Sequence, residues 1–224
     1  MGLGLSTGSG SGGEIRPYVK YDAKAGRMFR IDRVQGSDGQ YSTDQQEITN
    51  IAQFVVDLAN IRVGWINYTA QGPVRKLVVL GKEPIPARPT DTNSEGKLAF
   101  KQGFEVDILL NKESGGGPSR ILGSAAGCVI NAMDELHDAF SAAPESKSGK
   151  LPVVKIAGVS PVKSGQATNY QPKFQIVSWV DRPAALQPAA QETKAAPSVT
   201  PPSTGSTVAA PPVPQPAAIA SDFG

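Results

Sequence analysis

The feature that most constrains the fold is a single helical pattern set among strand-like segments. Between Ser119 and Phe140, apolar residues recur at steps of three and four, while polar and acidic residues fill the opposite side. Ser119 is suited to cap the first turn, and Pro144 follows the end of the pattern. Runs of β-branched and aromatic residues lie on both sides, so the sequence predicts several strands, one helix and two further strands.

The predicted strands follow an order that a known architecture shares. A five-stranded barrel with its helix between the third and fourth strands is the arrangement of the oligonucleotide/oligosaccharide-binding (OB) fold. We therefore predict a mainly β (α+β) protein with an OB-fold-like five-stranded barrel, one helix and an added N-terminal hairpin. Gln35–Gln46 and Gly81–Gly96 are expected to be loops. The five strands are predicted at residues 54–68, 75–80, 98–110, 152–159 and 173–180.

The segment from Ile15 to Arg33 interleaves basic and aromatic side chains. A groove for one nucleic-acid strand needs both kinds, because cations neutralise phosphates and flat rings stack on unpaired bases. The alternative is a hairpin that turns at Ala25-Gly26, with its rings in the core and its cations in solvent. This segment alone leaves both interpretations open.

Composition divides the chain into three parts. Residues 1–13 are rich in Gly and Ser and are expected to form a flexible N-terminus, and residues 14–183 are expected to form the folded domain. Residues 184–224 are dominated by Ala, Pro, Gln, Ser and Thr, a composition that cannot bury a core, so we predict a disordered tail. The net charge of +2 is too small to identify a partner, and no apolar run is long enough to span a membrane.

The sequence offers little material for catalysis, and we expect a protein that is not an enzyme and has no cofactor. His137 is the single histidine, so any histidine-dependent nucleophile would have to be built on it. Cys128 is the single cysteine and lies on the apolar helical stripe, which excludes an intrachain disulfide. Glu105 and Asp107 share one face of a predicted strand, as ligands of a hard cation or as charges on a solvated face.

The candidate binding residues are cations and rings that lie close together in the sequence. Phosphate contacts are expected from basic residues and base stacking from exposed rings, whereas Phe104, Phe140, Phe174 and Trp179 are assigned to the core. The candidate nucleic-acid-binding set comprises Arg16, Tyr18, Lys20, Tyr21, Lys24, Arg27, Arg30, Trp65, Tyr68 and Lys101.

Several phrases resemble bacteriophage single-stranded DNA-binding proteins with an OB fold. They are PYVKYDAKAGRMF, FVVDLANIRVGWINY, AFKQGFEVDILL, LPVVKIAGVSPV and YQPKFQIVSWVDRP, in that order. The resemblance implies sequence-independent coating and protection of single strands during phage DNA replication or recombination, in the cytoplasm of a bacterial host cell. It also implies recruitment of replication or recombination proteins through the tail tip, at Asp222 and Phe223. The tip departs from that family in carrying one acid and in ending on Gly224.

Two other functional classes remain open from the sequence. A phage structural or assembly protein would use the aromatic strands as a protein interface and would self-associate without nucleic acid. A carbohydrate-binding barrel would also use aromatic platforms, but it has little need of the basic cluster because sugars are mostly neutral. A homo-oligomer is compatible with each interpretation.

Overall fold

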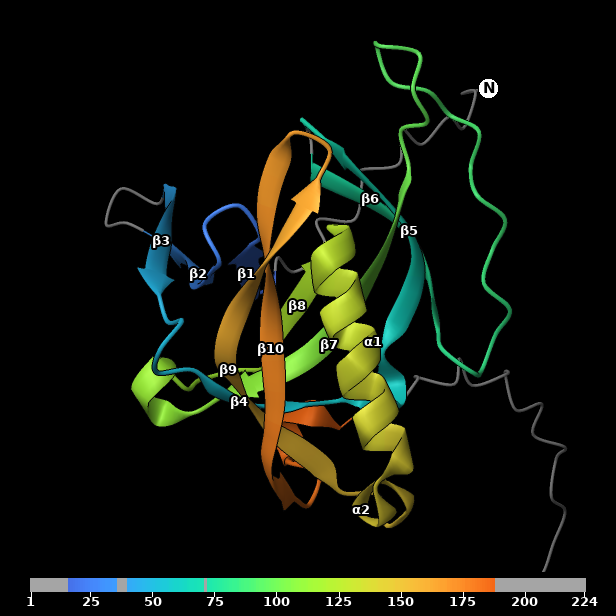
Figure 1. Cartoon of the computed structure of the whole chain (residues 1–224). Coiled ribbons are helices and arrows are strands. Elements are labelled where there is room, and N and C mark those ends of the chain that lie inside the picture. The colour runs from blue at the N-terminus through green and yellow to red at the C-terminus, as the bar shows by residue number, and fades with distance from the viewer. Residues whose placement is uncertain (1–15, 36–39, 71, 188–224) are drawn as a thin grey trace, which may run out of the picture. The chain divides into compact units, whose positions relative to one another are not determined.

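The computed structural model describes residues 16–35, 40–70 and 72–187 of the 224-residue chain. This part is mainly β, with ten strands in one mixed sheet and two α-helices (Figure 1). The strands are β1 (Tyr18–Asp22), β2 (Arg27–Gln35), β3 (Tyr41–Glu47), β4 (Gln53–Val56), β5 (Arg62–Thr69), β6 (Gly72–Val79), β7 (Lys101–Leu110), β8 (Arg120–Ser124), β9 (Leu151–Ser164) and β10 (Ala167–Val180). The helices are α1 (Gly127–Ala142) and α2 (Pro144–Lys147).

The sheet is open, and the prediction of a five-stranded barrel is wrong. Its strand order is β10-β9-β4-β7-β8-β1-β2-β3, with β5 pairing β7 and β6 pairing β5. All pairs are antiparallel except β1 with β8, which is parallel. The predicted strand at 54–68 is two strands, β4 and β5, because the 3-10 turn Leu58–Asn60 interrupts it. The N-terminal hairpin β1–β2 is confirmed, but it belongs to the sheet instead of being added to a barrel.

Two strands lie where the sequence predicts other structure. β3 falls in the predicted loop Gln35–Gln46, and its residues 42–47 are exposed. A strand exposed on both faces needs no alternation of apolar and polar residues, so its sequence carries no strand signal. β8 falls in the first turns of the predicted helix, because α1 begins at Gly127 instead of Ser119. Leu122 fits the helical pattern, yet it is buried as part of β8.

The hydrophobic core lies on one face of the sheet, beneath α1. In Figure 1, α1 lies in front of β7 and β8 and alongside β10. The core joins side chains from β2, β4, β7, β8 and α1, including Met28, Phe54, Val106, Leu122 and Met133. The predicted core positions of Phe104 and Phe140 are confirmed, and Phe174 and Trp179 pack against the same cluster. Since side chains alternate across a strand, every second residue of β7 and β8 faces away from this core.

The β1–β2 hairpin turns where the sequence predicts it. The Asp22 Oδ1 atom accepts hydrogen bonds from the backbone N–H groups of Lys24 and Ala25, and Gly26 has a φ of 67°. The hairpin tip also contacts β10, because the Tyr170 N–H donates to the Ala23 carbonyl at 2.6 Å. This contact brings two segments that are far apart in the sequence to one end of the sheet.

The folded part of the chain extends beyond the predicted boundary at residue 183. Ala184–Leu186 form a 3-10 turn with Leu186 buried, and the Arg182 guanidinium donates to the Leu186 carbonyl at 2.9 Å. Arg182 also donates to both carboxylate oxygens of the buried Asp57, and this hydrogen bonding raises the pKa of Arg182. The predicted flexible N-terminus, the remainder of the predicted tail and its tip at Asp222 and Phe223 lie outside the described residues.

Within the described ranges, neither helix is long and apolar enough to cross a membrane.

A glycine makes the close pairing of β5 and β6 possible, and its replacement provides a stability test. Gly64 has a φ of 149°, and a Cβ at this position would lie 2.2 Å from the Lys76 carbonyl oxygen. We predict that Gly64→Ala lowers the free energy of unfolding in urea by about 2–3 kcal/mol, because backbone strain at one residue costs this much. The matched control is Gly127→Ala at the start of α1, where a Cβ has open space. The control is expected to stabilise by up to about 1 kcal/mol, and equal effects of both variants would contradict the prediction.

Candidate nucleic-acid interface

A groove of about 1290 Å³ lies on the sheet face turned away from the core. Strands β1, β7 and β8 and the β5–β6 hairpin line it. Alternation along β1 turns Tyr18 and Lys20 to the groove face, whereas Val19 and Tyr21, which also border the groove, are buried in the core. The same alternation places Glu105 on the groove side of β7 and Val106 in the core.

Glycines keep the middle of this face shallow. A Cβ on Gly123 of β8 would lie 2.9 Å from the Glu105 Cγ atom and 3.0 Å from the Phe104 carbonyl oxygen. A Cβ on Gly103 of β7 would lie 2.8 Å from the Ser124 carbonyl oxygen. Only glycine fits at these positions, so the side chain of Glu105 lies across β8 and the backbone itself forms part of the floor.

Two tyrosine rings stand exposed in the groove. Tyr18 of β1 is 44% exposed and Tyr68 of β5 is 61% exposed. Strands β8 and β7 separate β1 from β5 in the sheet, so the two rings come from different sides of the groove. Desolvation first, and then the charge of Glu105, raise the pKa of Tyr68 above 10.0, with Arg75 opposing them.

Five cations line the groove together with one acid, Glu105, and a second acid, Asp107, follows two residues later on the same face of β7. Asp107 binds Arg16 at 3.0 Å and Arg62 at 3.1 Å, and Glu105 accepts a hydrogen bond from Arg75 Nε. Lys20 and Lys101 are exposed, and in the described part of the chain neither ammonium group has an ion-pair or hydrogen-bond partner. The groove therefore combines three oriented arginines with two lysines that are free to bind an anion.

Six of the ten predicted binding residues line this groove. The structure brings together Arg16, Tyr18, Lys20, Tyr21, Tyr68 and Lys101, and of these Tyr21 is buried. Arg62 and Arg75 also line it, and the predicted set omitted them. The sequence places Arg62 in the same predicted strand as Tyr68 and Arg75 in the next one. It does not show that β5 pairs with β7, where Arg62 lies opposite Glu105 and Ile66 opposite Lys101.

Tyr21 and Trp65 were predicted to stack on bases, and the structure assigns them other roles. Tyr21 is 5% exposed, belongs to the core and donates its hydroxyl to the Tyr170 carbonyl at 3.1 Å. The Trp65 indole N–H donates to the Pro86 carbonyl at 2.8 Å, and the Arg88 guanidinium lies 5.2 Å from the ring centre. The loop between β6 and β7 therefore occupies the ring of Trp65, and core packing occupies that of Tyr21.

Arg30 was predicted to contact phosphate, and it is instead part of an internal charge network. It alternates to the core side of β2, and its Nε lies 2.9 Å from Asp32 Oδ2. Asp32 also binds the buried Arg120 at 2.9 Å, and Arg120 in turn donates to the Pro118 carbonyl. This network attaches the loop before β8 to β2, so Arg30 has a structural role.

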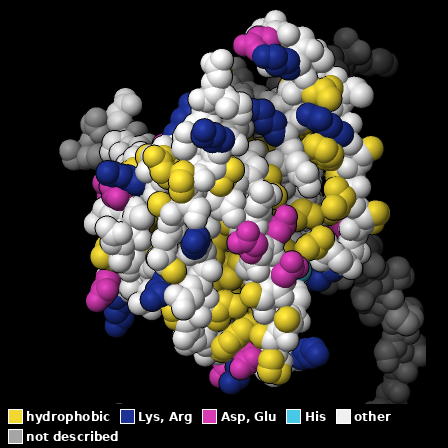
Figure 2. Space-filling view, viewed as in Figure 1, with side chains coloured by type: hydrophobic (Ala, Val, Ile, Leu, Met, Phe, Trp, Pro, Cys, Tyr) yellow, Lys and Arg dark blue, Asp and Glu magenta, His cyan; other side chains and the backbone are white. Residues whose placement is uncertain are grey.

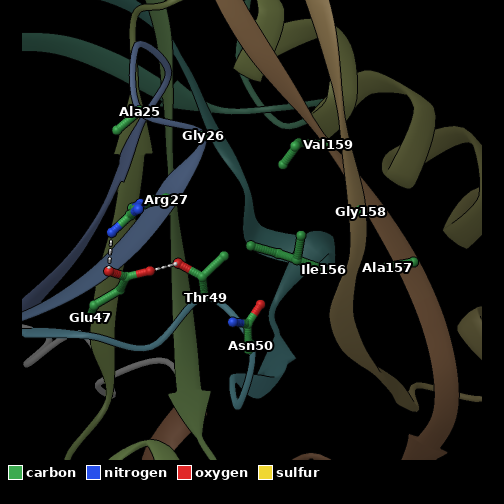
Figure 3. A pocket seen from close by; sticks show the side chains of 10 residues that line it. All are labelled: Ala25, Gly26, Arg27, Glu47, Thr49, Asn50, Ile156, Ala157, Gly158 and Val159. Carbon is green, nitrogen blue, oxygen red and sulfur yellow. Dashed lines mark hydrogen bonds and ion pairs between the residues drawn. The ribbon is translucent and has the colours of Figure 1, made fainter.

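Arg27 lies beside a second hollow, of about 550 Å³, which shares no lining residue with the groove. Figure 3 shows the Arg27 guanidinium paired with Glu47, at 2.8 Å, and Glu47 bonded to Thr49 on the wall opposite Ile156 and Val159. Lys24 is exposed at the hairpin turn and lines neither hollow. The tip of the hairpin thus lies outside the groove. Lys24 and Arg27 are therefore apart from the predicted binding residues that line it.

The acids Glu105 and Asp107 share one strand face, as predicted, but neither carboxylate is fully exposed to solvent. Glu105 is 7% exposed, and arginines bind both carboxylates. No group of three or more metal-ligating side chains occurs within the described ranges. These acids orient the arginines of the groove.

Comparison of the chain with family models, curated proteins and solved structures finds no match. The geometry of the groove and the chemistry of its residues are therefore the basis for inferring a function.

The burial of Tyr21 predicts a specific pH dependence of stability. Burial, and then the charges of Cys128 and Asp22, raise the pKa of Tyr21 from 10.0 to about 12 in the folded protein. Because the folded state retains the proton longer than the unfolded state, this stabilisation is complete below pH 10 and is lost as pH rises towards 12. Urea unfolding between pH 9 and 12 should show the loss, and Tyr21→Phe should reduce it. The control variant Tyr18→Phe, at an exposed ring, should leave the loss unchanged, and a profile unaltered by Tyr21→Phe would contradict the prediction.

Proposed function

We propose that this protein binds single-stranded DNA in the groove, without requiring a particular base sequence and without catalysis. The observation that carries the proposal is the pair of exposed rings, Tyr18 and Tyr68, set between unpartnered lysines on a concave sheet face. Rings that present a free face bind unpaired bases by stacking, whereas the bases of a duplex are already stacked on one another. The groove therefore favours a single strand over a duplex.

The positions of the charges support the same proposal. Lys20 and Lys101 supply ammonium groups for phosphates at two edges of the groove, and Arg16, Arg62 and Arg75 add further positive charge. The opposite face is different, because α1 exposes Asp134, Glu135 and Asp138, and acidic side chains gather over this helix in Figure 2. A polyanion is attracted to the groove and repelled by the exposed side of α1.

The biological setting of the proposal comes from the family resemblance. We place the protein among factors that coat and protect single strands during phage DNA replication or recombination, in the cytoplasm of a bacterial host. Replication or recombination proteins would bind the tail at Asp222 and Phe223. The rival function is a structural or assembly role, in which the exposed tyrosines would contact protein and the groove would bind no DNA.

The stacking role is tested with variants of the two exposed tyrosines. Tyr18→Ala and Tyr68→Ala should each weaken binding of a labelled oligothymidine by about 1–3 kcal/mol, or roughly 5- to 150-fold, since each removes one stacking platform. Fluorescence anisotropy of the label measures the affinity, because Trp65 and Trp179 pack elsewhere and do not report on the groove. Tyr170→Ala, which removes a tyrosine ring of β10 outside the groove, is the matched control and should bind as the parent does. Unchanged affinity in both folded alanine variants would refute the stacking role, and parent protein that binds no single strand would favour the assembly role.

The phosphate contacts are tested by the salt dependence of binding. For single strands the logarithm of the affinity falls against the logarithm of salt with a slope of about −0.7 per neutralised phosphate. Lys20→Gln and Lys101→Gln should each make the slope shallower by about this amount. Lys150→Gln, at an exposed lysine outside the groove, is the control and should leave the slope unchanged. Identical slopes in all four proteins would show that the two lysines do not contact phosphate.

A further inference from the structure

An acidic side chain lies deep in this basic groove. Glu105 is 7% exposed, and its side chain crosses Gly123, at the centre of the floor. A carboxylate there repels phosphates, so the backbone of a bound strand is kept towards the lysines at the edges. The part of a nucleotide that can approach Glu105 is then its base.

Glu105 and the neighbouring acid Asp107 differ in their remaining hydrogen-bonding capacity. Asp107 uses both oxygens, because Arg16 and Arg62 bind Oδ1 and Arg62 also binds Oδ2. Glu105 accepts from Arg75 Nε through Oε1, and no described residue donates to its Oε2. That oxygen is not sealed from solvent, and Glu105 lines the groove, so a ligand in the groove can approach it. The structure therefore holds one oriented carboxylate oxygen ready to accept a hydrogen bond from a ligand.

We infer that Glu105 gives the groove a base preference, favouring cytosine over thymine. The inference rests on the proposed single-strand binding. The edge of cytosine carries a 4-amino group that donates to a carboxylate, whereas thymine has a carbonyl oxygen in that position, which a carboxylate repels. Arg75 holds the carboxylate, and the exposed rings of Tyr18 and Tyr68 orient the bases around it. The influence of Glu105 on the pKa of Tyr68 agrees with this proximity of ring and acid.

The test compares oligodeoxycytidine and oligodeoxythymidine of about 16 nucleotides, the upper end of single-strand site sizes. Anisotropy is measured above pH 7, where cytosine is neutral. The parent protein should bind oligodeoxycytidine about tenfold more tightly, the effect expected of one hydrogen bond to a charged group. In Glu105→Gln the amide oxygen still accepts from Arg75 and the NH₂ group faces the groove, so thymine should now be preferred. Glu105→Ala should bind both oligomers about equally.

The matched control is Asp107→Asn, at the neighbouring acid whose oxygens are both occupied. It should change both affinities together and leave the cytosine-to-thymine ratio as in the parent protein. A second measurement needs no variant, because an oligomer of pyrimidin-2-one deoxynucleoside lacks only the 4-amino group of cytosine. The parent protein should bind this oligomer no more tightly than oligodeoxythymidine. This result can be obtained even if Glu105→Gln fails to fold.

Each outcome has a defined meaning. Equal binding of the two natural oligomers by the parent protein overturns the role of Glu105 and leaves single-strand binding standing. A preference that survives Glu105→Gln, or that survives removal of the 4-amino group, also overturns it. Failure to bind either oligomer overturns the proposed function and this inference together.

Discussion

The hydrogen-bond ladder of β7 is the interaction on which the remainder of the described structure depends. This strand pairs with β8 along one edge and with β4 and β5 along the other, so it joins the two halves of the sheet. Its alternate residues face opposite ways, which places Val106 and Ile108 in the core and turns Glu105 and Asp107 to the other face, where Glu105 lines the groove. A shift of register by one residue would bury the acids and expose the core, so packing and binding face are specified together.

The groove differs from a simple basic patch because its charges are held at different depths. Asp107 orients Arg16 and Arg62, and Glu105 orients Arg75. Lys20 and Lys101 remain free and exposed. Exposed ion pairs contribute little to stability, and Arg75 is partly exposed, so the value of these pairs lies mainly in orientation. Under the proposed function, this arrangement would direct phosphates to the lysines and leave the floor to the bases.

Much of the local structure was predictable from the sequence because it follows short-range rules. The turn at Ala25-Gly26 follows from Asp22 and glycine, and the strands at β6, β7, β9 and β10 follow from β-branched and aromatic alternation. β3 escaped because both of its faces are exposed, and β8 escaped because Leu122 also fits a helical period. The site was only partly predictable, since Tyr18 and Tyr21 are the same residue type three positions apart, and only the tertiary packing leaves Tyr18 exposed and buries Tyr21.

The sequence by itself determined the mainly β class, the hairpin, the long amphipathic helix and the concentration of cations and rings near the N-terminus. These features depend on residue type and on spacing along a few neighbouring positions. The tertiary structure alone decided that the sheet is open, that Tyr68 and Lys101 join Tyr18 and Lys20 in one groove, and that Arg30 and Trp65 do not. Pairings such as Ile66 with Lys101, and contacts such as Trp65 with Pro86, join residues distant in the chain, and local periodicity carries no information about which distant partner a strand or a ring will meet.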